Sequence, residues 1–161
     1  MAVYRQVERP PKAWITILLP RAISGRSIAK PTSAEHEPHG NGETILIVED
    51  DANLREINAH VLDRLGYRPL QAEDAISALA ILNETPEIAI LFTDVVLPGG
   101  MSGVDLMDEA LQQRPDLKVL FTSGYADNAI IDRGRIGSDF ELIEKPFSKD
   151  ILARKTHSFL E

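Results

Sequence analysis

The stretch Ile88–Gly100, IAILFTDVVLPGG, decides the fold of this 161-residue chain. It is an apolar run that is too short to span a membrane and that ends at Pro98–Gly100, a pattern typical of a strand buried on both faces of a sheet. Asp94 is its exceptional member, because a carboxylate inside a core strand is costly to bury without a partner. We therefore expect Asp94 at the carboxyl end of the strand, facing a crevice, where open α/β sheets do their chemistry.

Three further strand-like runs end in polar residues that suit the same chemistry. Thr44–Val48 is followed by Glu49, Asp50 and Asp51, Leu117–Phe121 by Thr122, and Phe140–Glu144 by Lys145. Adjacent carboxylates repel one another, and a bound divalent cation relieves this repulsion. Mg²⁺ suits such a place because it takes oxygen ligands and keeps several of its waters. A carboxylate nucleophile, a metal held by other acids, a hydroxyl and an ammonium are the parts of a phosphoryl-transfer site.

Helical patterns alternate with these strands. After Asn53, a good N-cap, apolar residues recur at helical spacing until Gly66 ends the helix; they are Leu54, Ile57, Val61, Leu62 and Leu65. Asp51 is either solvated or itself the cap of this helix. A weaker strand over 67–72, helices over 74–83, 103–113 and about 128–133, and a last helix capped by Ser148 complete the pattern. Such alternation predicts an α/β fold, a doubly wound five-stranded parallel sheet with strand order 2-1-3-4-5.

Residues 44–160 resemble a response-regulator receiver domain of two-component signalling, which has a flavodoxin-like fold. Four motifs match that family in order and spacing: Glu49-Asp50, Asp94, Thr122 and Lys145-Pro146. Each stands at the end of a predicted strand, so together they are far more specific than any one alone.

The resemblance implies a role for each matching residue. Asp94 would be the phosphoacceptor, Thr122 would donate a hydrogen bond to the phosphoryl group, and the Lys145 ammonium would pair with Asp94 or its phosphate. The peptide bond between Lys145 and Pro146 is often cis in the family. The implied Mg²⁺ ligands are Glu49, Asp50, Asp94 and the backbone carbonyl of Val96. The implied partner is a sensor histidine kinase or a histidine phosphotransfer protein, with a homodimer left open. Such a domain catalyses only its own phosphorylation and dephosphorylation, so we do not expect a conventional enzyme.

Two rival functions remain open at this point. A phosphatase of the haloacid-dehalogenase type would place a second Asp two residues after the nucleophile, where this chain has Val96, and it would carry a cap insertion. A binding module that works unphosphorylated is the other rival. It stays open because Leu142 stands where the family usually carries an aromatic switch residue.

Charge divides the chain into two parts. Residues 1–42 carry six Lys or Arg and three Asp or Glu, whereas residues 43–161 carry eleven and twenty-two. We predict a tail and flexible linker over 1–42 and the receiver over 43–161. Within the tail, residues 13–22 resemble the last strand of a histidine kinase ATP-binding domain, with an unrelated β-prone tail as the alternative.

The overall composition indicates which partners and which cellular location to expect. Its net charge of -8 argues against a nucleic-acid partner. We expect no membrane partner and no secretion signal, because the apolar run at 13–19 is too short to cross a bilayer. The chain has no Cys, which agrees with a cytoplasmic location.

Overall fold

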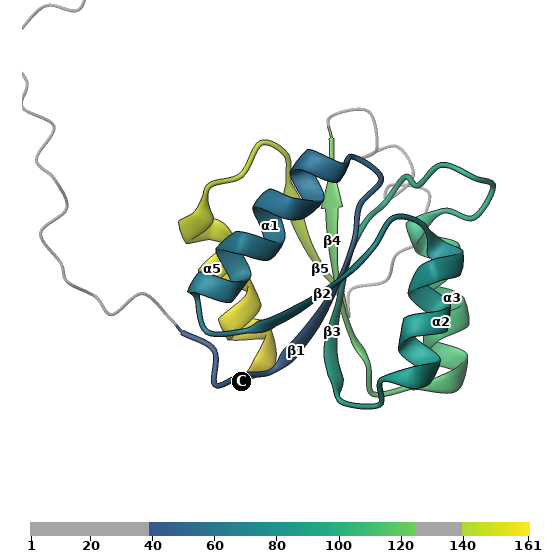
Figure 1. The fold of residues 1–161 in the computed structure, drawn as a ribbon, viewed down its shortest axis with the longest axis horizontal. Coiled ribbons are helices and arrows are strands. Elements are labelled where there is room, and N and C mark those ends of the chain that lie inside the picture. Colours follow the sequence, from purple (N-terminus) through teal and green to yellow (C-terminus); the bar gives the residue numbers. More distant parts are fainter. Residues whose placement is uncertain (1–38, 125–139) are drawn as a thin grey trace, which may run out of the picture. The chain divides into compact units, whose positions relative to one another are not determined.

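The computed structural model describes residues 39–124 and 140–161, which form a parallel sheet with helices on both faces (Figure 1). The five strands lie in the order β2-β1-β3-β4-β5, which confirms the predicted doubly wound fold and its strand order. The elements are β1 Thr44–Val48, α1 Ala52–Arg64, β2 Arg68–Ala72, α2 Ala75–Glu84, β3 Ile88–Asp94, α3 Gly103–Gln113, β4 Lys118–Ser123, β5 Glu141–Glu144 and α5 Lys149–Leu160.

The parallel strands place the polar residues at their carboxyl ends along one edge of the sheet. All five residues of β1 are buried, as are most residues of β3 and β4. Val48 pairs with Thr93 across β1 and β3, and Asp94 pairs with Thr122 across β3 and β4. Because all these strands are parallel, their carboxyl ends lie together. The residues that follow each strand therefore meet at that edge.

Two apolar layers hold the helices against the sheet. Helices α1 and α5 cover one face, where Leu62 of α1 and Leu152 of α5 pack with β-strand residues such as Ile90. Helices α2 and α3 cover the other face, where Leu82 and Leu106 are buried. This burial on both sides explains why β3 reads as a nearly continuous apolar run.

The N-cap of α1 is Asp51, so the prediction of Asn53 was wrong and the alternative of Asp51 as the cap is confirmed. The Asp51 carboxylate accepts hydrogen bonds from the backbone N–H groups of Asn53 and Leu54, at 2.8 and 3.1 Å. The helix already begins at Ala52. The predicted Ser148 cap of α5 and the stop of α1 at Gly66, which has a φ of +87°, are both confirmed.

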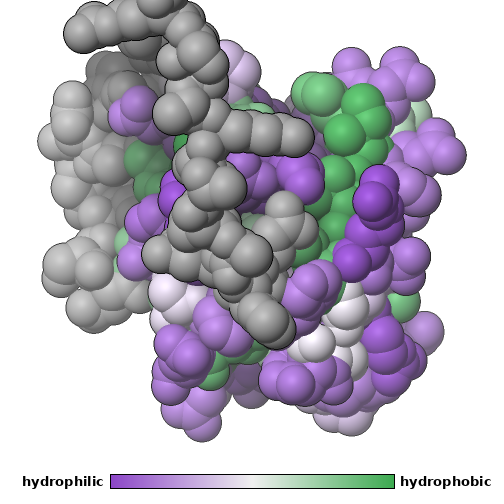
Figure 2. All heavy atoms as spheres, turned by 90° about the vertical axis from the view of Figure 1, so that its left-hand side faces the viewer, coloured by the Kyte–Doolittle hydropathy of each residue, from purple (hydrophilic) through white to green (hydrophobic). Residues whose placement is uncertain are grey.

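The apolar face predicted for α1 was wrong in its first turns. Leu54 and Ile57 are exposed, whereas Leu62 and Leu65 of the same predicted face are buried, as are Asn58 and Ala59. On the side of the molecule that carries α1 and α5, Figure 2 shows apolar surface among polar surface.

Several predicted features lie outside the described residues. These are the short helix around 128–133 and most of the tail, including the strand-like stretch at 13–22. No helix in 39–124 or 140–161 combines the length and apolar character needed to cross a membrane.

Candidate functional site

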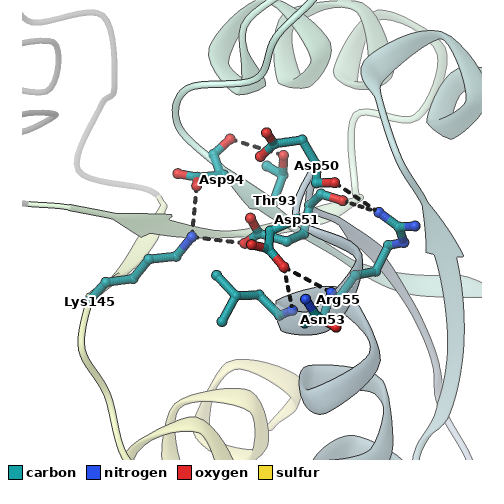
Figure 3. Close-up of polar contacts among 9 residues, drawn as sticks. Asp50, Asp51, Asn53, Arg55, Thr93, Asp94 and Lys145 are labelled. Atoms are coloured by element: carbon teal, nitrogen blue, oxygen red, sulfur yellow. Dashed lines mark hydrogen bonds and ion pairs between the residues drawn. The ribbon is translucent and has the colours of Figure 1, made fainter.

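A lysine joins two carboxylates at the carboxyl edge of the sheet. Lys145 follows β5, and its Nζ donates to Glu49 Oε2 at 2.8 Å and to Asp94 Oδ2 at 2.7 Å (Figure 3). These three residues come from the ends of three different strands, and the Lys145–Pro146 peptide bond is cis. The long lysine side chain lets the end of β5 reach the ends of β3 and β1.

The ion pairs are largely shielded from solvent. The side chains of Glu49, Asp94 and Lys145 are 4%, 14% and 23% exposed. Burial alone would lower the pKa of Lys145. Hydrogen bonds and charge attraction from Asp94 and Glu49 outweigh burial and raise that pKa. The ammonium therefore stays charged at neutral pH and offsets part of the negative charge at this edge.

Hydrogen bonds fix the backbone directly after Asp94. The N–H of Val95 donates to the carbonyl of Thr122 at 2.9 Å, and the N–H of Gly103 donates to the carbonyl of Val95 at 3.0 Å. At Gly103, a Cβ would lie 1.9 Å from the carbonyl oxygen of Asp94. The start of α3 can approach the strand end this closely because residue 103 has no side chain.

The turn after β1 is fixed in a similar way. Asp51 caps α1, and the backbone N–H of Glu49 donates to the carbonyl of Ala72 at 3.3 Å. Arg55 Nη1 donates to the carbonyl oxygens of Glu49 and Asp50, at 2.6 and 3.4 Å. Asp50 itself is exposed to solvent at the rim of the site.

The other predicted site residues also lie at or near this edge. Thr122 is a buried member of β4 beside Asp94, because β4 continues to Ser123 instead of ending at Phe121. Val96 lies just past β3 with its side chain exposed. Leu142 is half-buried in β5 and packs against the core on the α2 and α3 side.

The oxygen ligands at the ends of β1 and β3 suit Mg²⁺, although the part of the chain that the structure describes holds no preassembled cluster of three metal ligands. Among the described residues, no group of three His, Cys, Asp or Glu side chains is placed to hold a metal. Mg²⁺ does not need one, because one or two carboxylates and several waters usually hold it. Glu49 and Asp94 already converge on a cation, and the buried Asp94 Oδ1 has no hydrogen-bond partner among the described residues. That oxygen would be available as a ligand for a metal or as a hydrogen-bond acceptor for a metal-bound water.

Two residues that shape the site were not predicted from the sequence. Gly103 is a close-approach glycine, and its signal was its position directly after Ser102, which caps α3. Arg55 lies among alternating polar residues of α1, where nothing in the local pattern distinguishes it from a solvated arginine.

Comparison with known proteins agrees with this geometry. Residues 45–157 match the family model of the response regulator receiver domain. The sensor kinase CckA of Brucella abortus is 33% identical over 153 residues, which take in 90% of this chain and 16% of that kinase. The response regulator receiver protein CpdR of Brucella abortus is 34% identical over 103 residues, 64% of this chain and 84% of CpdR.

A solved structure shows the same likeness in three dimensions. The receiver domain of NtrX from Brucella abortus superposes with a TM-score of 0.64 at 34% identity, covering 72% of this chain and 97% of that domain. The family match extends over more than half of this chain. The chain therefore belongs to the response-regulator receiver domains of two-component systems.

Proposed function

We propose that Asp94 accepts a phosphoryl group from a phosphohistidine of a partner kinase or phosphotransfer protein. The observation that carries this proposal is the placement of the Lys145 ammonium between Asp94 and Glu49, at 2.7 and 2.8 Å. This contact holds the Asp94 carboxylate at an edge where negative charge is partly balanced. A carboxylate held in this way is ready to act as a nucleophile.

The transfer exchanges one bond for another. A carboxylate oxygen of Asp94 forms a bond to phosphorus as the phosphorus–nitrogen bond of the phosphohistidine breaks. The bonding electron pair returns to the histidine ring nitrogen, and Asp94 becomes an acyl phosphate. Mg²⁺ held by Glu49, Asp50, Asp94 and the Val96 carbonyl would supply positive charge to the phosphoryl oxygens.

Two side chains of this chain would stabilise the transferred group. The Lys145 ammonium already contacts Asp94, and it needs a small shift to reach a phosphoryl oxygen on that residue. The hydroxyl of Thr122, from the strand beside Asp94, would donate to another phosphoryl oxygen. Both donors supply charge-assisted hydrogen bonds where negative charge develops.

A relay of phosphate within a kinase pathway is the role we favour for the phosphorylated domain. The alignment with CckA takes in more of this chain than the receiver match over 45–157 does, which supports a kinase-like origin for part of residues 1–42. The alternative output is a phosphorylation-dependent change in a protein-interaction face. Leu142 stands where the family usually carries an aromatic switch residue, which supports phosphate relay over that alternative. The partner would be a sensor histidine kinase or a histidine phosphotransfer protein.

The test is the intact mass of the protein after incubation with acetyl phosphate. We expect one phosphoryl adduct that requires Mg²⁺ and is absent from Asp94→Asn. If the folded protein gives no adduct with any phosphodonor, it works by binding alone. Steady turnover of phosphomonoesters would instead support the phosphatase alternative.

A further inference from the structure

The acidic turn between β1 and α1 is held by an arginine from inside the first helix. Arg55 Nη1 donates at 2.6 Å to the carbonyl of Glu49 and at 3.4 Å to the carbonyl of Asp50. In Figure 3 the guanidinium approaches the turn opposite Lys145, which contacts the carboxylates. The peptide groups that carry both acidic side chains are therefore tied to α1.

Other contacts make this tie rigid. The backbone N–H of Arg55 donates to the carbonyl of Asp51 at 2.9 Å, and the side chain of Asp51 caps the same helix turn. The backbone of Arg55 is thus fixed, and its side chain extends back to the turn that carries Glu49 and Asp50. Its planar guanidinium can span two neighbouring carbonyl groups, whereas a lysine ammonium acts as a single point charge.

We propose that Arg55 is a positioning residue for Mg²⁺ binding, a proposal that rests on the proposed function. By holding the Glu49 and Asp50 carbonyls, Arg55 orients the two carboxylates before the metal arrives. A flexible turn would have to be ordered on binding, which weakens affinity. Outer partners that orient metal ligands typically contribute about 10–100-fold to metal affinity.

Charge and positioning predict opposite effects of removing Arg55. The guanidinium is a positive charge near a cation site, so charge alone would make its removal strengthen Mg²⁺ binding. Positioning makes the same removal weaken Mg²⁺ binding. The direction of the change in affinity therefore separates the two roles.

The experiment titrates MgCl₂ into the full chain and follows amide NMR shifts of the turn that contains Glu49 and Asp50. We expect Arg55→Gln to weaken Mg²⁺ affinity about tenfold, and Arg55→Lys to recover part of the loss. The matched control is Arg64→Gln, which removes the same charge from the last turn of the same helix. It should leave the affinity within about twofold of wild type, since screening weakens charge effects over that distance.

The outcomes separate this inference from the proposed function. Unchanged or tighter Mg²⁺ binding by folded Arg55→Gln overturns the positioning role while wild-type binding stands. Full recovery by Arg55→Lys also overturns it, because a single-point donor would then do what the proposal assigns to a guanidinium that spans both carbonyls. Absence of Mg²⁺ binding by the wild type overturns the metal site itself. If Arg55→Gln does not fold, Arg55→Lys decides, and an affinity equal to wild type refutes the proposal.

Discussion

Replacing Lys145 by Met should destabilise the protein far more than replacing a surface lysine. At an effective dielectric constant of about 20, contacts of 2.7 and 2.8 Å are worth about 6 kcal/mol each before desolvation. Desolvation cancels most of this gain, but removing one partner of a buried ion pair still costs about 3–5 kcal/mol. Because Lys145 is 23% exposed, we expect Lys145→Met to lose about 2–4 kcal/mol in the free energy of unfolding.

The matched control is Lys155→Met. Lys155 pairs with Glu141, but those side chains are 40% and 37% exposed, and surface pairs of this kind contribute about 0–1 kcal/mol. Urea denaturation of both variants, without Mg²⁺, gives the comparison. Mg²⁺ should then reduce the difference in the free energy of unfolding between Lys145→Met and wild type, because the carboxyl groups of Glu49 and Asp94 remain and the competing ammonium is gone. A ligand at ten times its Kd stabilises the folded state by about 1.4 kcal/mol.

Equal losses from the two lysine variants would refute this reasoning. They would mean that the contacts of Lys145 with Glu49 and Asp94 contribute no more than an exposed pair. A deficit in Lys145→Met that Mg²⁺ leaves unchanged would show that losing the ammonium does not strengthen metal binding by the two carboxylates.

Three further predictions follow from the backbone and from burial. Gly103→Ala forces a Cβ toward the carbonyl of Asp94, so urea denaturation should show a loss of about 1–3 kcal/mol and acetyl phosphate should label the variant more slowly. Asp51→Ala removes the N-cap of α1 and should cost about 1 kcal/mol in thermal unfolding, whereas Asn53→Ala should stay within about 0.5 kcal/mol. Burial, and then the Glu43 carboxylate, raise the pKa of Tyr67 to about 12 from 10 in the unfolded chain. Unfolding therefore releases a proton above pH 10, and the free energy of unfolding should fall as pH rises from 10 to about 12, with a smaller fall in Tyr67→Phe.

The parallel sheet and the clustering of polar residues at one of its edges could both be predicted from the sequence. Both depend on the direction of the strands. Apolar runs such as Ile88–Asp94 could be recognised as buried strands, and alternation with helices made them parallel. Parallel strands must then bring their carboxyl ends together. That reasoning placed Asp94, Glu49 and Lys145 at one edge, where the structure joins them by ion pairs.

The helix faces and caps depended on packing that local patterns do not contain. Leu54 and Ile57 have helical spacing but are exposed, because the orientation of α1 on the sheet instead buries Asn58 and Ala59. Asp51 and Asn53 are both favourable N-caps, so residue type alone could not decide between them.

Arg55 and Gly103 act through contacts with distant or backbone groups. The Arg55 guanidinium reaches carbonyls of the preceding turn, and Gly103 matters because α3 approaches the carbonyl of Asp94. Neither requirement leaves a mark in hydrophobic periodicity or charge. The backbone of the folded chain shows the contacts that give both residues their roles.

The most direct test of the account is to identify the residue that carries the phosphoryl group. Borohydride reduces an acyl phosphate of aspartate to homoserine but leaves a phosphothreonine intact. After labelling with acetyl phosphate and Mg²⁺, reduction and peptide mapping should find homoserine at position 94. A phosphoryl group on Thr122, or homoserine at another acidic residue, would contradict the central claim that Asp94 is the phosphoacceptor.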